Sequence, residues 1–255
     1  MVNCHKDDQA DCCGKCGKKD FKVVACIPVF GRLPLLKHTI ERLYKKNGVF
    51  KLICVGDGHE ERKICESLGA EWVQHSNKPL GKKWNHAFMA AEKHNPDACL
   101  FVGSSDWLSD TWIDEMIPYM DDFDLVGTNG CYFMHIGNYE TKVCFWPGYI
   151  NNRKGESIGI GRMISARVLK KLQWKPFDDH LFNSLDGSMQ KRVIKVAGNI
   201  HSTDSLKAKS VSISTDCWVN KHVFSDHWDG KLPSIMVDKD TFINGYFPEA
   251  KEVFK

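Results

Sequence analysis

Several residues able to do chemistry follow apolar runs of the sequence. The stretch LFVGSSDWLSD starts like a buried strand and then turns polar at Ser105 and Asp106. Two other apolar runs end at Phe30-Gly31-Arg32 and at Gly56-Asp57-Gly58. In parallel sheets, ligands bind beyond the carboxyl ends of the strands, which share one edge. Each segment alone is typical of an ordinary turn, but two acids and an arginine at one edge favour a ligand-binding site.

A second group of reactive side chains lies in the first 16 residues, where four cysteines surround His5. Cys13 and Cys16 have the C-x2-C spacing that allows two thiolates to bind one zinc ion from a tight turn. Cys4, His5 or Cys12 would complete a tetrahedral set. A strong zinc motif has two such pairs, so the alternative is a flexible tail with reduced thiols.

The composition is that of a soluble globular protein, because 42% of the residues are hydrophobic and 26% are charged. The net charge of +3 is too small to indicate nucleic-acid binding by itself. No apolar run reaches the roughly 18–20 residues that span a bilayer, so no membrane insertion is expected. The first residues, MVNCHKDDQADCC, lack the apolar core of a secretory signal. We therefore expect a cytoplasmic protein with reduced cysteines, in the host cytoplasm if the protein is viral.

Elements that would position these residues alternate along the chain. Strand-like segments cover residues 21–29, 50–55, 71–74 and 98–102, and helix-like segments cover residues 33–46, 60–68 and 80–93. This alternation predicts an α/β fold with a mainly parallel sheet flanked by helices. Three cysteines within the apolar runs, Cys26, Cys54 and Cys99, are expected in the core.

The order of these motifs resembles that of family 2 glycosyltransferases with the GT-A fold. Six residues match positions at which these enzymes bind the donor nucleotide: Pro28, Phe30, Arg32, Asp57, Gly81 and Asn85. Asp57 takes the place of the acid that contacts the base, and the glycine and asparagine lie in PLGKKWNHAF. The resemblance spans about residues 22–195. It implies a GT-A-like α/β fold with a mixed, mainly parallel sheet.

The main departure from the family lies in its metal-binding motif. These enzymes carry an Asp-x-Asp motif at the end of the fourth strand, whereas this chain has Ser104-Ser105-Asp106. The alignment implies that Asp106 binds Mn²⁺ or Mg²⁺ and that Ser105 replaces the acid that contacts the ribose. Such a metal takes most of its ligands from water and the diphosphate, so one carboxylate suffices. The alternative for Asp106 is to cap a helix that begins near Ser109.

The second half of the chain corresponds to the acceptor side of these enzymes. Gly159-Ile160-Gly161-Arg162 resembles the loop beneath the donor sugar, with Arg162 near the diphosphate, although a tight strand-to-helix connection is the alternative. The segment WKPFDDHLFNSLDGSM matches the region of the general base, with Asp186 as first choice and Asp179 as second. The alternative for Asp186 is the N-cap of the following helix.

Further along, the resemblance implies a late histidine as an additional metal ligand, either His222 or His227, against the alternative of a packed or surface histidine. Residues 1–20 form a Cys-rich tail and candidate zinc knuckle, and residues 21–255 form the GT-A-like domain. Within it we expect a nucleotide-sugar half over about residues 21–110 and an acceptor half over about residues 111–255.

Together these motifs predict a divalent-metal-dependent glycosyltransferase, a hexosyl- or pentosyltransferase. It would move a sugar from a nucleoside-diphosphate donor, UDP-linked, to a hydroxyl of a glycan or of a hydroxymethylated DNA base. Short soluble enzymes of this type include viral ones. The alternatives are a catalytically silent nucleotide- or glycan-binding module and a zinc-dependent nucleic-acid-binding protein.

Overall fold

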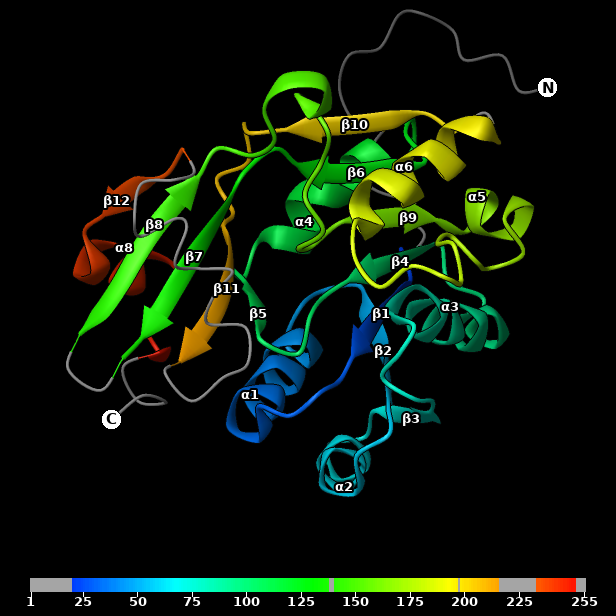
Figure 1. Ribbon diagram of the computed structural model, residues 1–255, viewed down its shortest axis with the longest axis horizontal. Helices are drawn as coiled ribbons and strands as arrows, with labels where there is room; N and C mark the ends of the chain where they lie inside the picture. The colour runs from blue at the N-terminus through cyan, green and yellow to red at the C-terminus, as the bar shows by residue number, and fades with distance from the viewer. Residues whose placement is uncertain (1–19, 138–139, 197, 216–232, 251–255) are drawn as a thin grey trace, which may run out of the picture.

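The computed structural model describes residues 20–137, 140–196, 198–215 and 233–250, which form an α/β fold with two sheets (Figure 1). The larger sheet has seven strands in the order β10-β6-β9-β4-β1-β2-β3. These strands are β1 (Val23–Pro28), β2 (Val49–Gly56), β3 (Glu71–Gln74), β4 (Ala98–Phe101), β6 (Leu125–Thr128), β9 (Met163–Ser165) and β10 (Ile200–Thr203). All neighbours pair in parallel except β9, which is antiparallel to both β4 and β6. The predicted α/β class with a mainly parallel sheet is confirmed.

Helices cover both faces of the larger sheet. They are α1 (Leu33–Tyr44), α2 (His59–Ser67), α3 (Leu80–Ala91), α4 (Trp112–Met116), α5 (Ala166–Lys171) and α6 (Leu185–Lys195). Alternate residues of β1 point to opposite faces: Val23, Ala25 and Ile27 pack with α1, α2 and α4, while Val24 and Cys26 pack with α3, α5 and α6. A strand buried on both faces needs an unbroken apolar sequence, which explains the run VVACI.

A smaller, five-stranded sheet lies beside the first, in the order β12-β8-β7-β11-β5 (Figure 1). Its strands are β5 (Asp106–Leu108), β7 (Cys131–Ile136), β8 (Thr141–Trp146), β11 (Ser210–Thr215) and β12 (Ile235–Val237). One face of this sheet packs on the C-terminal helix α8 (Lys239–Tyr246), mainly on its Phe242. The same face also contacts Phe247, just beyond the helix. Short 3-10 turns, η1 (Glu92–His94), η2 (Ile117–Met120) and η3 (Asn151–Arg153), complete the fold.

The core agrees with one expectation from the sequence. Cys26, Cys54 and Cys99 are buried free thiols, as predicted. Within the described part of the chain, no helix has both the length and the apolar character needed to cross a membrane.

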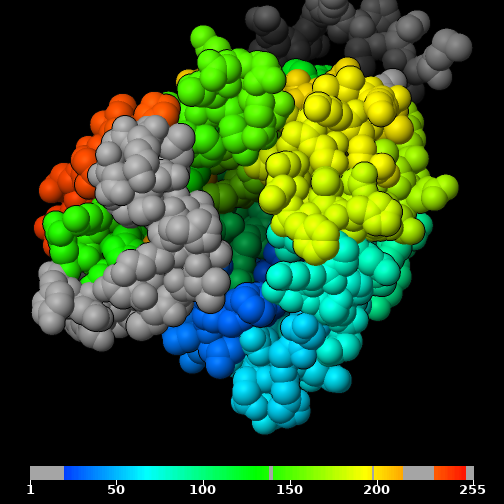
Figure 2. Space-filling view, in the orientation of Figure 1, coloured from blue at the N-terminus to red at the C-terminus, as the bar shows by residue number. Residues whose placement is uncertain are grey.

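Figure 2 shows a hollow near the centre of the displayed face, bordered by segments coloured blue, cyan, green and yellow. Distant parts of the chain therefore meet around one concave surface.

Candidate active site

Asp106 lies at the start of β5, just beyond the carboxyl end of β4. Its Oδ2 atom accepts a hydrogen bond from the backbone N–H of Gly103 at 2.9 Å. The alternative that Asp106 caps a helix near Ser109 is wrong, because α4 begins at Trp112 with Thr111 at its N-cap. The carboxylate is therefore held by its own turn, with its position fixed relative to the sheet edge.

The turn before Asp106 requires a glycine. A Cβ atom at Gly103 would lie 2.5 Å from Asp106 Oδ2, so any other residue would displace the carboxylate. Burial raises the pKa of Asp106, while hydrogen bonds from Ser212 and Gly103 and the charge of Arg32 act in the opposite direction. Burial thus makes the ionised form of Asp106 unfavourable, while several hydrogen-bond donors stabilise it. This combination is expected of a carboxylate that exchanges a proton or binds a cation.

Arg32 and Ser105 form the wall next to Asp106. Arg32 follows β1 in a left-handed conformation with φ of 58°, and its Nη1 donates to Ser105 Oγ at 2.9 Å. Burial lowers the pKa of Arg32, and the charge of Asp106 opposes this effect. The structure therefore brings Arg32, which follows β1, next to Ser105 and Asp106, which both follow β4.

Asp57 and Phe30 are exposed beyond the carboxyl ends of β2 and β1, where the sequence predicts that the donor binds. Asp57 follows β2, is exposed, and accepts a hydrogen bond from the backbone N–H of Asn77 at 3.1 Å. Phe30 lies two residues beyond Pro28, the last residue of β1, and about half of its surface (52%) is exposed. An exposed aromatic ring near an exposed carboxylate suits a nucleobase, which stacks and hydrogen-bonds.

Asp186 lies in the first turn of α6 and is held by two side chains. Tyr149 Oη donates to Asp186 Oδ2 at 2.7 Å, and Arg162 Nη1 lies 3.4 Å from Asp186 Oδ1. The alternative that Asp186 is only the N-cap of this helix is wrong, because Ser184 occupies that position. A Cβ atom at Gly159 would come within 2.9 Å of Asp186 Oδ1. The Gly-rich turn therefore approaches this carboxylate closely.

Arg162 has a different place from the one expected. Its side chain has no exposed surface, and it donates through Nε to Ser157 Oγ at 2.9 Å and through Nη2 to the Ser157 carbonyl oxygen. The resemblance to family 2 glycosyltransferases implied that this guanidinium lies near the donor diphosphate, whereas the structure buries it beneath Asp186. Its role in the structure is to fix and charge-balance that carboxylate.

Asn85 and Gly81 also contact protein where a donor contact was expected. The Asn85 amide exchanges hydrogen bonds with the backbone of Phe177, both at 3.0 Å, and donates to Asp179 Oδ1 at 2.8 Å. A Cβ atom at Gly81 would lie 2.1 Å from the Asp178 carbonyl oxygen. Both residues therefore hold the segment 177–181 against α3, and Asn85 is buried beneath it.

Asp106 and Asp186 line the same cavity, which has a volume of about 250 Å³. Asp179 is not among its lining residues, so the structure favours Asp186 as the acid next to Asp106. The other walls include six aromatic rings: Trp84, Phe101, Phe133, Trp146, Tyr149 and Phe177. Sequence reasoning missed Tyr149, although an aromatic residue directly after a Pro-Gly turn at the end of an apolar run was a usable signal.

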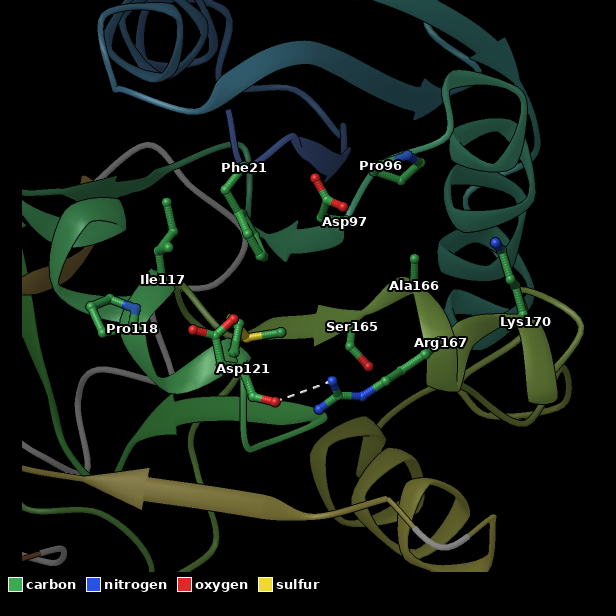
Figure 3. Close-up of a pocket in the computed structure, with 11 residues that line it drawn as sticks. Phe21, Pro96, Asp97, Ile117, Pro118, Asp121, Ser165, Ala166, Arg167 and Lys170 are labelled. Carbon is green, nitrogen blue, oxygen red and sulfur yellow. Dashed lines mark hydrogen bonds between the residues drawn. The ribbon is translucent and has the colours of Figure 1, made fainter. Parts of the chain in front are cut away.

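A larger cavity, of about 760 Å³, lies at the opposite edge of the main sheet (Figure 3). It is lined by Phe21 and Asp97, which precede β1 and β4, and by Arg167 of α5. Arg167 is already paired with Asp124 and donates to the Asp121 carbonyl oxygen at 3.3 Å. This cavity lies at the amino ends of the parallel strands, away from the edge where such sheets bind ligands.

The residues available for a metal ion are few. Within the described ranges, no group of three or more His, Cys, Asp or Glu side chains is arranged to bind one. A metal at Asp106 would therefore depend on a bound diphosphate and water for its other ligands, which suits Mg²⁺ or Mn²⁺. The expected ligands His222 and His227, and the expected zinc ligands Cys4, His5, Cys12, Cys13 and Cys16, lie outside the described residues.

Neither the protein-family models nor the curated proteins contain a match to the sequence. Among solved structures, TarS from S. aureus matches with a TM-score of 0.49 at 14% identity, over 77% of this chain and 58% of that one. The CMP:2-keto-3-deoxy-manno-octonic acid synthetase bound to CTP matches with a TM-score of 0.47 at 13% identity, over 82% and 98%.

A mannosyltransferase from Pyrobaculum calidifontis, in complex with GDP-Man and Mn²⁺, matches with a TM-score of 0.54 at 10% identity. The match covers 81% of this chain and 60% of the mannosyltransferase. At this identity the likeness concerns the fold alone. Together with the strand order and the helices on both faces, it identifies the fold of this chain as GT-A-like.

Proposed function

We propose that this protein is a glycosyltransferase that uses a nucleoside-diphosphate sugar, of the kind found in family 2. The observation that carries the proposal is that Asp106 and Asp186 face one cavity beyond the carboxyl end of β4. The exposed Asp57 and Phe30 provide a place for the base, which we take to be uracil. The sugar would then extend from this edge toward Asp106.

Asp106 is the residue that would hold a divalent metal, Mn²⁺ or Mg²⁺, which when bound neutralises charge on the leaving diphosphate. The residues fit this role because the carboxylate is half-buried, supplied with hydrogen-bond donors and next to Arg32. Arg32 adds positive charge at the same edge and fixes Ser105, the residue that replaces the second acid of the usual motif.

Asp186 is our candidate for the base that takes the proton from the acceptor hydroxyl. Arg162 and Tyr149 fix the orientation of its carboxylate, as a general base requires. The cavity of about 250 Å³ is at the small end for a ligand site, and its aromatic walls suit a single ring. We therefore favour an acceptor that inserts one ring, either a sugar of a glycan or a hydroxymethylated base.

A catalytically silent nucleotide-binding module is the second candidate. It is favoured by the contacts of Tyr149 and Arg162, which occupy both oxygens of Asp186 in the structure. Such a module would bind the donor through the same edge and leave it intact.

The test is a panel of nucleotide sugars with and without Mn²⁺, read by thermal shift and by release of free nucleoside diphosphate. We expect one donor to stabilise the protein in a metal-dependent manner and to be turned over slowly in the absence of acceptor. The Asp106→Ala variant should lose the metal-dependent shift, and Asp122→Ala, at an exposed position, should keep it. Stabilisation without release in the presence of glycan and DNA acceptors would select the silent module, and no binding at all would refute both.

A further inference from the structure

Lys83 is a buried lysine that the proposed chemistry does not use. It lies on α3, and only 1% of its surface is exposed. Its Nζ atom donates to the carbonyl oxygen of Val29 at 2.6 Å and to Asn77 Oδ1 at 2.7 Å. Both acceptors lie at the edge where the donor nucleotide is proposed to bind.

The two hydrogen bonds connect the ends of several strands. Val29 follows β1, and its backbone N–H donates to the carbonyl oxygen of Val55 in β2 at 2.8 Å. Asn77 follows β3, and its backbone N–H donates to Asp57 Oδ2 at 3.1 Å. Asn77 therefore links the two charges, because its side chain accepts from the Lys83 ammonium and its backbone N–H donates to the Asp57 carboxylate.

Burying an ammonium group is unfavourable, and a neutral side chain would connect α3 to β1 at lower cost. Burial lowers the pKa of Lys83 to about 8, and the negative charges of Asp57 beyond β2 and Glu61 on α2 oppose this shift. Two acceptors also leave one of the three ammonium N–H groups without a partner in the described part of the chain. The position thus holds a cation with spare donor capacity next to the exposed Asp57.

We propose that Lys83 is a positioning residue for the donor nucleotide: its ammonium fixes Asn77 and, through Asn77, the Asp57 carboxylate that contacts the base. This inference rests on the proposed function of the same edge. It adds that nucleotide affinity depends on the charge of a residue on α3 that is buried away from solvent.

The charge dependence has a definite sign. Below about pH 8 the ammonium is protonated and holds Asn77 with charge-assisted hydrogen bonds. As the pH rises through about 8, the amine becomes neutral, its hydrogen bonds weaken, and nucleotide affinity should fall. The phosphates of the nucleotide are already ionised in this range, since their last pKa is about 6.

The test is calorimetric titration of the full chain with UDP and with GDP in the presence of Mg²⁺, from about pH 6.5 to about pH 9.5. Four proteins are compared: the wild type, Lys83→Met, Lys83→Arg and the control Lys93→Met. Lys93 lies in the turn after the same helix, where it is exposed and pairs with Glu71.

We expect Lys83→Met to bind the preferred nucleotide at least about tenfold more weakly near neutral pH and to lack the decline at high pH. Lys83→Arg should also lack the decline, because a guanidinium stays charged throughout this range. Lys93→Met should behave as the wild type.

The inference is overturned if the wild-type affinity is constant up to about pH 9.5, or if Lys83→Met binds like the wild type. In both cases the proposed function stands, because nucleotide binding has been observed. Should Lys83→Met fail to fold, the dependence of nucleotide affinity on pH in the wild type and in Lys83→Arg still decides whether the inference holds. A wild type that binds no nucleotide at any pH refutes the proposed function and this inference with it.

Discussion

Asp106 and Asp186 line one cavity, yet the protein holds their charges in different ways. Asp186 is paired with a fully buried arginine and with a tyrosine hydroxyl. Asp106 instead receives backbone and hydroxyl donors, and burial raises its pKa. At the scale of the residue, the contacts of Asp186 stabilise the fold, whereas Asp106 is kept at a cost to stability.

The cost at Asp106 should be measurable as a dependence of stability on pH. Its pKa is higher in the folded protein than in the unfolded chain, so ionisation weakens the folded state. The penalty is fully present above the folded-state pKa and disappears as the pH falls below the unfolded-state value. In metal-free buffer, Asp106→Asn should therefore be more stable than the wild type at neutral pH.

Urea unfolding from neutral to acid pH checks this prediction, and the difference between the two proteins should vanish at the acid end. Asp122→Asn, at an exposed position, serves as the control and should show no comparable gain. A variant that is less stable than the wild type at neutral pH would contradict the interpretation.

The pair of Asp186 and Arg162 predicts the opposite effect. Replacing Asp186 with asparagine leaves the buried guanidinium without its anion and should lower the free energy of unfolding by about 3 kcal/mol. Tyr149→Phe removes a neutral hydroxyl that bonds Asp186 and Arg153, and should cost about 1 kcal/mol. Denaturant titration of both variants distinguishes the two contributions, and equal losses would show that the ion pair adds nothing beyond the contacts of one hydroxyl.

At the scale of the element, α3 connects both parts of the site. Gly81 and Asn85 are four residues apart and so lie on one face of the helix, against the segment 177–181. Lys83 contacts the loops that follow β1 and β3, at the edge proposed to bind the donor. The helix therefore links this edge to the segment that leads into Asp186.

The hydrogen bonds by which Asn85 holds residues 177–181 against α3 can be tested by hydrogen exchange. In Asn85→Ala the N–H of Phe177 loses its acceptor, and the Phe177 carbonyl oxygen loses its donor. We expect faster exchange across residues 177–181 and a loss of about 2 kcal/mol in stability. Asn47→Ala, which removes only an exposed contact with Asp114, should leave both unchanged. Unaltered exchange at Phe177 in Asn85→Ala would show that other contacts hold this segment.

At the scale of the whole molecule, Arg42 joins the two sheets and the C-terminal segment. It lies on α1 with its guanidinium carbon 5.1 Å from the ring centres of Trp107 and Phe247. It also donates to the Leu108 carbonyl oxygen at 2.9 Å and pairs with Glu249. One side chain thus connects a helix of the larger sheet to β5 of the smaller sheet and to the chain beyond α8.

Arg42→Met should therefore destabilise the fold by about 2 kcal/mol and increase exchange in residues 239–250. The measurement is denaturant unfolding together with hydrogen exchange read by peptide. Arg62→Met removes an arginine from an exposed pair with Glu66 and should change stability by less than about 1 kcal/mol. If the two variants behave alike, the polar and cation–π contacts of Arg42 add nothing to stability and the sheets are joined by apolar packing alone.

The sequence by itself determined the α/β class of this protein and the position of two candidate acids, Asp57 and Asp106, after strands of the main sheet. Strands buried on both faces, such as β1, must be apolar along their whole length, and helices on a sheet must be amphipathic. These local patterns can be recognised without coordinates. The apolar runs end shortly before Asp57 and Asp106. Both acids therefore lie beyond the carboxyl ends of β2 and β4.

Only the tertiary structure decided what these residues contact. Asn85 meets Phe177 92 positions along the chain, and β5 pairs with β11 about as far away, so no local pattern predicts either contact. Arg162 was expected at a ligand and lies beneath Asp186 instead. The physical reason is that hydrogen bonds and ion pairs depend on which groups packing brings within reach, and packing is a property of the whole chain.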